Sequence, residues 1–319
     1  MRAAVVEQLE GPRAIRVTEQ PEPAGAGVRI AVSAAGVTFP DALLTRGRYQ
    51  LRPEPPFVPG AEVSGVVTDA PSGSGFTVGD RVAAFPGLGG FAERVVVPEH
   101  LVFPLPDEVD TEVAAGLPMN LLTVHFALVD RGRLQADERV LVHGAAGGIG
   151  VAAIQLAVAR GAHVIAVTST EEKAATARAA GAHEVVAVEG FRDAIQELTD
   201  GEGVDVVLDP VGGDRVTDSL RCLRRRGRLL VVGFTEGQIP SVKVNRLLLN
   251  NLDVVGVGWG AHWLAEPGYP GQQWAELLPD LRAGRLVPPI GARHRLEDAA
   301  EAVASLEERR AVGKVLLLP

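Results

Sequence analysis

The sequence predicts an α/β protein with two parts, a β-rich, barrel-like unit and a doubly wound parallel sheet with helices on both faces. Three observations support this prediction: the length of 319 residues, short β-branched runs in the first third, and apolar strands that alternate with helical stretches after it. A chain of this length with 46% hydrophobic residues can bury a large core and exceeds the usual size of one domain. We therefore expect two domains.

The first part covers residues 1–118, where short apolar runs are separated by Gly, Pro and Asp. These runs are GVRIAVSAAGV, EVSGVVTDA, GDRVAAF and FAERVVVP. Closely spaced short strands with turn residues between them are typical of an all-β, barrel-like unit.

In residues 119–258, predicted strands alternate with segments of helical periodicity. The strand candidates are RVLVHG, HVIAVTS, EVVAV, VDVVLDP, RLLVVGF and LDVVGVG. This alternation is typical of a parallel sheet that is covered on both faces. In residues 259–319, two amphipathic segments and the run GKVLLLP predict two helices and a last strand, and this tail could return to the first part.

Charge and cysteine content limit the classes of partner and location. The formal net charge of −9 opposes nonspecific attraction to nucleic acid or an anionic membrane, so neither partner is expected. The single cysteine, Cys222, can form neither an internal disulfide nor a multi-cysteine zinc site, which favours a reducing cytoplasmic location. No segment has the uncharged core of a signal peptide or the length of a membrane span.

A glycine-rich loop follows the first strand of the alternating part. The run LVHGAAGGIGVAAIQLAVARG predicts a strand, a tight turn and a helix that begins near Gly148, whose N-terminal N–H groups suit a pyrophosphate. Gly144 permits the turn, and Gly150 lets the helix lie close to the strand. A turn without a ligand would use the same residues, but its place at the start of a βα series favours dinucleotide binding. The candidate cofactor residues here are Gly144, Ala145, Gly147, Gly148 and Ile149.

The end of the second strand indicates which dinucleotide binds. Many NAD sites have a carboxylate there, whereas this chain has Thr168 and Ser169, with Lys173 shortly after. Hydroxyls and a lysine can receive a 2′-phosphate, which favours NADPH over NADH. The alternative is a purely structural role, because STEE, residues 169–172, also fits a capping box and Lys173 could be a solvated helix residue.

With the motifs GAAGGIGVAAIQLA, PFVPGAEVSGVV and GVTFPDALLTRGRY, the chain resembles the medium-chain dehydrogenase/reductase superfamily over essentially its whole length. Within it, the chain is most similar to the zinc-free NADPH:quinone oxidoreductase branch. The resemblance implies a GroES-like catalytic domain from residues 1–118 and 259–319, a Rossmann NADP-binding domain over residues 119–258, and a cleft between them. It also implies a homodimer or homotetramer.

The zinc ligands of related dehydrogenases are replaced in this sequence. Zinc-dependent relatives place a Cys after AAGV, a His-Glu pair after the Gly of PG, and a Cys or Asp before the Rossmann part. This chain has Thr38, then Ala61 ahead of Glu62, and Met119. These side chains form no tetrahedral shell for zinc, so we predict no metal.

The expected reaction is hydride transfer from NADPH to a quinone. An alternative is reduction of activated C=C bonds in 2-enones or enoyl-CoA, and a third possibility is a non-catalytic NADPH-binding sensor. The sequence assigns no catalytic acid or base, because solvent can supply the protons of quinone reduction. Fold alone does not decide among these functions.

The resemblance also implies residues beside the nicotinamide and the acceptor. Thr38 could donate one hydrogen bond to the acceptor, and Tyr49 could donate to a carbonyl or simply pack. Trp259 falls where relatives meet the nicotinamide or substrate. The remaining cofactor candidates, at the domain junction and at a strand end, are Asn120, Thr123, Gly233 and Phe234.

Other polar residues have structural interpretations. Asp41 and Arg46 are expected to fix their loop by local hydrogen bonds, and Asp209 to end a strand and order a turn. The arginine cluster in the segment RCLRRRGR is expected to surround a helix end, where cations complement the dipole.

Overall fold

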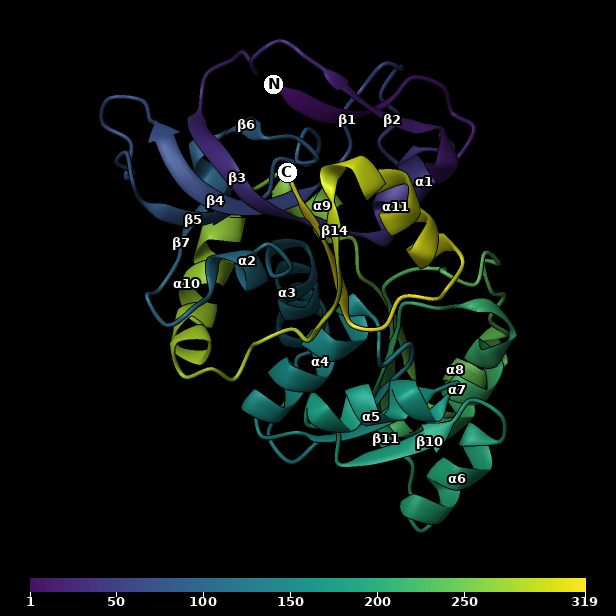
Figure 1. Cartoon of the computed structure of the whole chain (residues 1–319). Helices are drawn as coiled ribbons and strands as arrows, with labels where there is room; N and C mark the ends of the chain where they lie inside the picture. The colour runs from purple at the N-terminus through teal and green to yellow at the C-terminus, as the bar shows by residue number, and fades with distance from the viewer. The chain divides into compact units, whose positions relative to one another are not determined.

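The computed structural model describes residues 1–319, which form two compact units (Figure 1). The first unit comprises Met1–Asn120 and Glu266–Pro319, and the second comprises Leu121–Ala265. The first unit is β-rich and the second is a parallel sheet with helices, so the predicted fold class is confirmed. No helix combines the length and the apolar character that crossing a membrane requires.

The first unit is built on a seven-stranded sheet with the order β14-β15-β3-β4-β5-β7, in which β6 pairs with β3. The pairs are antiparallel except β14 with β15, and β1 and β2 form a separate antiparallel pair. The C-terminal strand β15 pairs directly with β3. The strands are β1 (Arg2–Val6), β2 (Ile15–Glu19), β3 (Val28–Val37), β4 (Glu62–Asp69), β5 (Arg81–Ala84), β6 (Arg94–Val97), β7 (Val102–Pro104), β14 (Ile290–Arg295) and β15 (Lys314–Leu318).

Short helices cover this sheet. Helix α10 packs on it through Trp274, whose ring stacks on Phe103 at 5.0 Å between centroids and whose indole N–H donates to the Pro104 carbonyl oxygen at 3.0 Å. The helices are α1 (Phe39–Leu44), α2 (Thr111–Ala114), α10 (Tyr269–Arg282) and α11 (Ala299–Glu307), with 3₁₀ turns η1 (Pro12–Ala14), η2 (Glu99–Leu101) and η5 (Leu296–Asp298). Helix α3 (Pro118–His125) runs from the end of the first unit into the second.

The second unit is a six-stranded parallel sheet with the order β10-β9-β8-β11-β12-β13. Strand β11 has all six residues buried, as expected for a central parallel strand that is covered on both faces. The strands are β8 (Arg139–Val142), β9 (His163–Thr168), β10 (Glu184–Ala187), β11 (Val204–Asp209), β12 (Leu223–Val231) and β13 (Asp253–Gly256).

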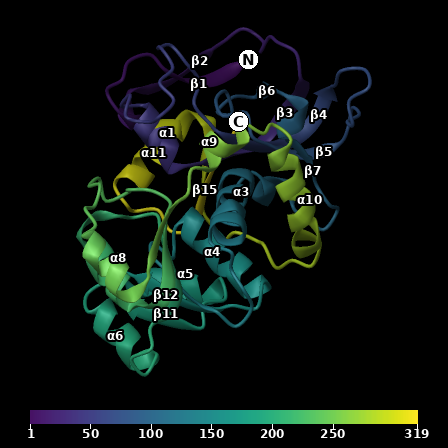
Figure 2. The same cartoon turned by 180° about the vertical axis from the view of Figure 1, so that it is seen from behind.

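Helices connect these strands and lie on both faces of the sheet. Figure 1 shows α4 and α5 in front of the sheet, and Figure 2, seen from behind, shows α8 in front. The helices are α4 (Gly148–Ala159), α5 (Glu171–Ala179), α6 (Phe191–Leu198), α7 (Val216–Cys222), α8 (Val244–Asn250) and α9 (Trp259–Trp263), with the π-helical segment η3 (Phe126–Arg131) and the 3₁₀ turn η4 (Gly213–Arg215).

The prediction for the arginine cluster is wrong for most of its members. Only Arg221 lies in the last turn of helix α7, because the chain passes straight from α7 into β12. The strand therefore includes Arg224, Arg225, Arg226 and Arg228. Arg224 forms an ion pair with the buried carboxylate of Asp205, so it serves the strand rather than a helix dipole.

Candidate functional site

The glycine-rich turn has the local geometry that the sequence predicts. Strand β8 ends at Val142 and helix α4 begins at Gly148. Gly144 has a φ of +58°, in the left-handed region that glycine adopts without strain, and its carbonyl oxygen accepts the Gly147 N–H at 3.0 Å. The N–H groups of the first turn of α4 have no preceding helical turn whose carbonyl oxygens could accept their hydrogen bonds, so they can donate to an anion.

Gly150 brings helix α4 against this turn. A Cβ atom at this position would lie 2.3 Å from the Gly144 carbonyl oxygen and 2.6 Å from the Ala145 Cα. Both neighbours are backbone atoms, so no side-chain rotation relieves the contact. The predicted role of Gly150 in close packing is therefore confirmed.

The glycine turn lies where the strand order of the sheet reverses. Strands β9 and β10 continue to one side of β8, while β11, β12 and β13 continue to the other. In doubly wound sheets, ligands bind outside the carboxyl ends of the strands at this reversal. A Cβ on Gly144 would lie 3.2 Å from the Val211 side chain, so the turns after β8 and β11 adjoin.

Asp209 orders the turn after β11, as the sequence predicts. Its carboxylate accepts the N–H groups of Val211 at 2.8 Å and Gly212 at 3.0 Å. Gly212 in turn adjoins Phe234, because a Cβ on Gly212 would lie 2.9 Å from the Phe234 ring. Gly233 and Phe234 follow strand β12 and so lie at the same carboxyl edge as the glycine turn.

The polar residues at the end of strand β9 have features of both interpretations given above, the helix cap and the phosphate site. Thr170 caps helix α5 and accepts the Lys173 N–H at 3.3 Å, so the cap is Thr170 and not Ser169. The Lys173 ammonium group lies 3.5 Å from the Ser169 hydroxyl oxygen. Helix capping by Thr170 thus leaves a hydroxyl and an ammonium group side by side at the strand end, next to the buried Thr168.

The remaining candidates divide between the two units. Thr123 and Trp259 belong to the second unit and Asn120 to the first, and all three are buried. Asn120 donates its amide hydrogen to the Gly116 carbonyl oxygen at 3.4 Å. Trp259 begins α9, with its ring centroid 6.0 Å from that of Trp263.

The hydroxyl hydrogen of Thr38 is used within the chain, whereas from the sequence we expect it to be donated to the acceptor molecule. Its hydroxyl donates to the Asp41 carboxylate at 2.6 Å, so this hydrogen is not available to an acceptor molecule, although the oxygen can still accept. Asp41 also accepts the N–H groups of Thr38 at 2.8 Å and Gly60 at 3.0 Å. The predicted loop-fixing role of Asp41 is confirmed. That of Arg46 is wrong, since its guanidinium pairs with Glu307 on the distant helix α11.

Burial raises the pKa of Asp41 from 3.8 to about 6, although the three hydrogen bonds and the charge of Lys314 act in the opposite direction. The folded protein therefore binds this proton more tightly than the unfolded chain does. Lowering the pH through 6 toward 3.8 increases the contribution of Asp41 to the free energy of unfolding, and above this window that contribution is lost.

We expect the wild type to gain stability relative to the Asp41→Asn variant as the pH falls. Between about pH 7.5 and about pH 5, the difference between their free energies of unfolding should change by about 1 kcal/mol in favour of the wild type. Urea unfolding of both proteins at the two pH values measures this change. An equal pH dependence in the two proteins would show that Asp41 does not titrate in this window.

Tyr49 presents a phenol hydroxyl with no hydrogen-bond partner within the chain. Its side chain is partly buried, and burial followed by the charge of Asp41 raises its pKa above 10.0. The phenol therefore stays protonated near neutral pH and can donate a hydrogen bond.

At the positions that bind zinc in related dehydrogenases, this chain has residues that pair with other side chains. The buried Glu62 carboxylate forms an ion pair with the buried Lys314 ammonium and accepts the Met119 N–H at 2.7 Å. No group of three or more His, Cys, Asp or Glu side chains is arranged to hold a metal ion. With Glu62 bound to Lys314, and Thr38 bound to Asp41, these residues do not fit a catalytic zinc.

Sequence reasoning found Glu62 but missed Lys314 as its partner. The two residues lie far apart in the sequence, so no local pattern marks them as partners. A lysine inside a run of apolar residues is the only signal, because such a residue is almost never fully buried unless it is paired.

The chain matches known families along both units. Residues 25–107 match the alcohol dehydrogenase GroES-like domain, and residues 148–279 match the zinc-binding dehydrogenase family. Quinone oxidoreductase-like protein 2 of Bos taurus is 37% identical over 99% of this chain and 92% of its own length. The 2-haloacrylate reductase of a Burkholderia species is 32% identical over 99% of this chain and 98% of its own length.

The solved structures agree with these relatives. The quinone oxidoreductase of Thermus thermophilus, which was also solved in complex with NADPH, is 36% identical and superposes with a TM-score of 0.85 over 100% of both chains. Together with the relatives, this similarity extends over the whole chain and both units. The chain therefore belongs to the quinone oxidoreductase branch of the medium-chain dehydrogenase/reductase superfamily and is an oxidoreductase.

Proposed function

We propose that this protein is an NADPH-dependent quinone oxidoreductase that needs no metal. The observation that carries the proposal is the glycine turn between β8 and α4, placed where the strand order of the parallel sheet reverses. The NADPH complex of the Thermus thermophilus relative supports the choice of cofactor. In this proposal the second unit binds the cofactor, and the first unit contributes residues that bind the acceptor.

Residues of the second unit can hold both phosphate-containing parts of the cofactor. The N–H groups of Gly148 and Ile149 would bind the pyrophosphate, and Gly147 would let it approach the backbone. The Lys173 ammonium and the Ser169 hydroxyl would bind the 2′-phosphate, since they already lie 3.5 Å apart. The other cofactor assignments remain predictions: Gly144, Ala145, Thr168, Asn120, Thr123, Gly233 and Phe234.

The bound nicotinamide supplies a hydride, and the protein orients the acceptor and stabilises the charge that develops on it. Tyr49 can donate its phenol hydrogen to the oxygen that becomes negative, because its hydroxyl has no other partner and stays protonated. Thr38 can only accept, and Trp259 stays a predicted pocket residue. Addition of one hydride and one proton from solvent to a quinone yields the hydroquinone.

A second candidate is the reduction of an activated C=C bond. It is favoured by the similarity to a 2-haloacrylate reductase, whose aligned region covers 99% of this chain. The two functions share the cofactor geometry and differ in the acceptor.

The two candidates can be distinguished with purified protein treated with a metal chelator. Oxidation of NADPH and NADH is followed with simple quinones, 2-enones, 2-haloacrylate and crotonyl-CoA as acceptors. Rapid NADPH oxidation by quinones alone is the expected result. Turnover confined to enones, haloacrylate or the thioester would replace the proposal by the second candidate, and loss of activity that zinc restores would overturn the metal-free mechanism.

The Lys173→Glu variant tests the proposed 2′-phosphate site. Exchange of a cation for an anion beside a phosphate should raise the KM for NADPH by about tenfold or more, while the KM for NADH should change by less than about twofold. Steady-state kinetics with both cofactors measure this difference. Lys243→Glu is the matched control, because it changes the same charge at the N-cap of α8 and should affect neither cofactor. Equal effects of Lys173→Glu on the two cofactors would reject the site.

We also propose that the protein forms a homodimer through the second unit. Strand β13 ends the sheet order and so has an unpaired edge. The preceding helix α8 exposes Val244 at 75%, Leu248 at 77% and Leu249 at 71% of their surface. An open strand edge beside exposed apolar side chains suits a second copy of the same surface, and sedimentation velocity would measure the mass.

A further inference from the structure

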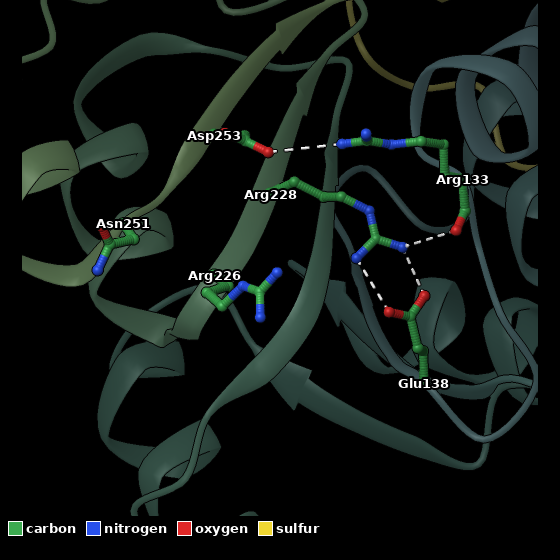
Figure 3. Close-up of a pocket in the computed structure, with 6 residues that line it drawn as sticks. All are labelled: Arg133, Glu138, Arg226, Arg228, Asn251 and Asp253. Atoms are coloured by element: carbon green, nitrogen blue, oxygen red, sulfur yellow. Dashed lines mark hydrogen bonds and ion pairs between the residues drawn. The ribbon is translucent and has the colours of Figure 1, made fainter.

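A polar pocket of about 450 Å³ lies in the second unit at the amino ends of strands β12 and β13. The glycine turn is at the carboxyl ends of the same parallel sheet, so the pocket is separate from the proposed cofactor site. Figure 3 shows the side chains that line it. They are Arg133, Glu138, Arg226, Arg228, Asn251 and Asp253.

Cations outnumber anions in this pocket, although the chain as a whole carries a net charge of −9. Three guanidinium groups face two carboxylates, and the sixth residue, Asn251, adds an uncharged amide. No aromatic or aliphatic side chain contributes to the lining. A ligand of this pocket would therefore be recognised through charge and hydrogen bonds rather than by burial of apolar surface.

The guanidinium group of Arg228 is held by hydrogen bonds within the chain and forms one wall of the pocket. Its guanidinium makes two contacts with the Glu138 carboxylate, one of them at 3.0 Å, and further hydrogen bonds to the carbonyl oxygens of Gly132 and Arg133. Its side chain is only 9% exposed. Arg228 and Glu138 thus neutralise one another and fix the turn that carries Arg133.

The other two arginines remain able to bind an anion. Arg133 lies 3.6 Å from Asp253, and both side chains are more than half exposed at 69% and 56%, so solvent weakens this pair. Arg226 has no hydrogen-bond or ion-pair partner in the chain. Figure 3 shows its guanidinium without a dashed contact, on the same side of the strands as that of Arg228.

The backbone around the pocket is held in a conformation that ordinary residues avoid. Six non-glycine residues of the chain have a positive φ, and three of them line this pocket: Arg133 at 52°, Arg226 at 65° and Asn251 at 52°. Glycine would adopt this conformation at lower cost. Arginine at position 226 thus provides an unpaired cation where glycine would suit the backbone better.

We propose that this pocket binds a compact anion with two phosphate groups, held by the guanidinium groups of Arg226 and Arg133. A guanidinium group presents a fork of N–H donors that matches two oxygens of one phosphate. Arg226 and Arg133 together outweigh the repulsion by Asp253, so an anion with several negative charges gains more net attraction here than a single carboxylate does. The lining offers no aromatic ring or apolar side chain to a nucleobase, so we assign the ligand class as an inorganic or small organic diphosphate.

Isothermal titration calorimetry with inorganic pyrophosphate tests this site. The titration is made at low ionic strength, with and without saturating NADPH, because pyrophosphate could also enter the proposed cofactor site. We expect binding of pyrophosphate that persists with NADPH present and weakens as salt is added. Titration with succinate distinguishes phosphate from carboxylate recognition and should give binding weaker by about tenfold or more.

The Arg226→Gly variant separates binding from folding. It removes the unpaired cation but suits the positive φ, so its free energy of unfolding should be at least that of the wild type. Its affinity for pyrophosphate should fall by about tenfold or more. Arg225→Gln is the matched control, since Arg225 is the exposed neighbour outside the pocket and its variant should keep the wild-type affinity within about twofold.

Three results would overturn the proposal. They are no binding of pyrophosphate to the wild type, binding that NADPH abolishes, and Arg226→Gly binding as tightly as the wild type. Because none of these readouts measures oxidoreductase activity, the result is independent of the proposed quinone reduction.

Discussion

Substitution of Gly150 by alanine is expected to destabilise the protein by about 3 kcal/mol and to abolish tight NADPH binding. The new methyl group would lie 2.3 Å from the Gly144 carbonyl oxygen, so helix α4 must move away from the glycine turn. Alanine stabilises a helix relative to glycine by only about 1 kcal/mol, so the steric cost exceeds the gain in helix propensity. Urea unfolding and NADPH titration measure the two effects.

Gly147→Ala is the matched control for this variant. The nearest atom to a Cβ on Gly147 is the Gly144 carbonyl oxygen at 3.4 Å, and the φ of Gly147 is −86°, so alanine fits the backbone. We expect its stability to stay within about 1 kcal/mol of the wild type while NADPH affinity falls by about tenfold, because the methyl group occupies the approach of the pyrophosphate. Wild-type NADPH affinity in Gly147→Ala would contradict the proposed cofactor position, and wild-type stability in Gly150→Ala would contradict the close packing.

Substitution of Lys314 by methionine is expected to cost about 3 to 5 kcal/mol of folding free energy. It removes the partner of the Glu62 carboxylate, which is completely buried and retains only the Met119 N–H as a hydrogen-bond donor. Because Lys314 begins strand β15, the loss should also loosen the pairing of the C-terminal tail with β3. Chemical unfolding gives the energy, and hydrogen exchange of the β15 amides shows where the structure opens.

The double variant Glu62→Gln with Lys314→Met shows whether the unpaired charge is the cause. Glutamine carries no charge and can still accept the Met119 N–H, so the double variant should recover most of the lost stability. If Lys314→Met is as stable as the wild type, the ion pair contributes nothing to folding. If the double variant is as unstable as the single one, packing of the lysine stem is responsible rather than charge.

Local sequence patterns were sufficient for strand β8, the glycine turn and the turn after β11 in the second unit. The limits of β8 and the start of α4 near Gly148 follow from apolar periodicity and from glycines that interrupt it, since both depend on neighbouring residues only. Asp209 was placed in its turn for the same reason, because its partners lie two and three residues away. The arginine cluster was misplaced, because pairing of Arg224 with Asp205 and of β12 with its neighbours extends the strand beyond its apolar run.

The candidate site was predictable to the same extent. The glycine turn and the residues around Lys173 were found because each is a short motif with a physical function. The hydrogen bond from Thr38 to Asp41 was not foreseen as a limit on Thr38, although the two residues are close in sequence, because only the fold buries the carboxylate and brings Gly60 to its other oxygen. The pairing of Arg46 with Glu307 depends equally on tertiary contacts.

The sequence by itself determined the α/β class, the glycine turn and the polar end of the second strand, because each is encoded within a few turns of helix or one strand. Tertiary structure alone decided the strand order that places the glycine turn at the reversal of the sheet. It also decided the burial of Glu62 against Lys314 and the meeting of Arg133, Arg226 and Asn251 around one pocket. The physical reason is that charge pairing and burial act between residues that are distant in sequence, and no local periodicity records which of them will meet.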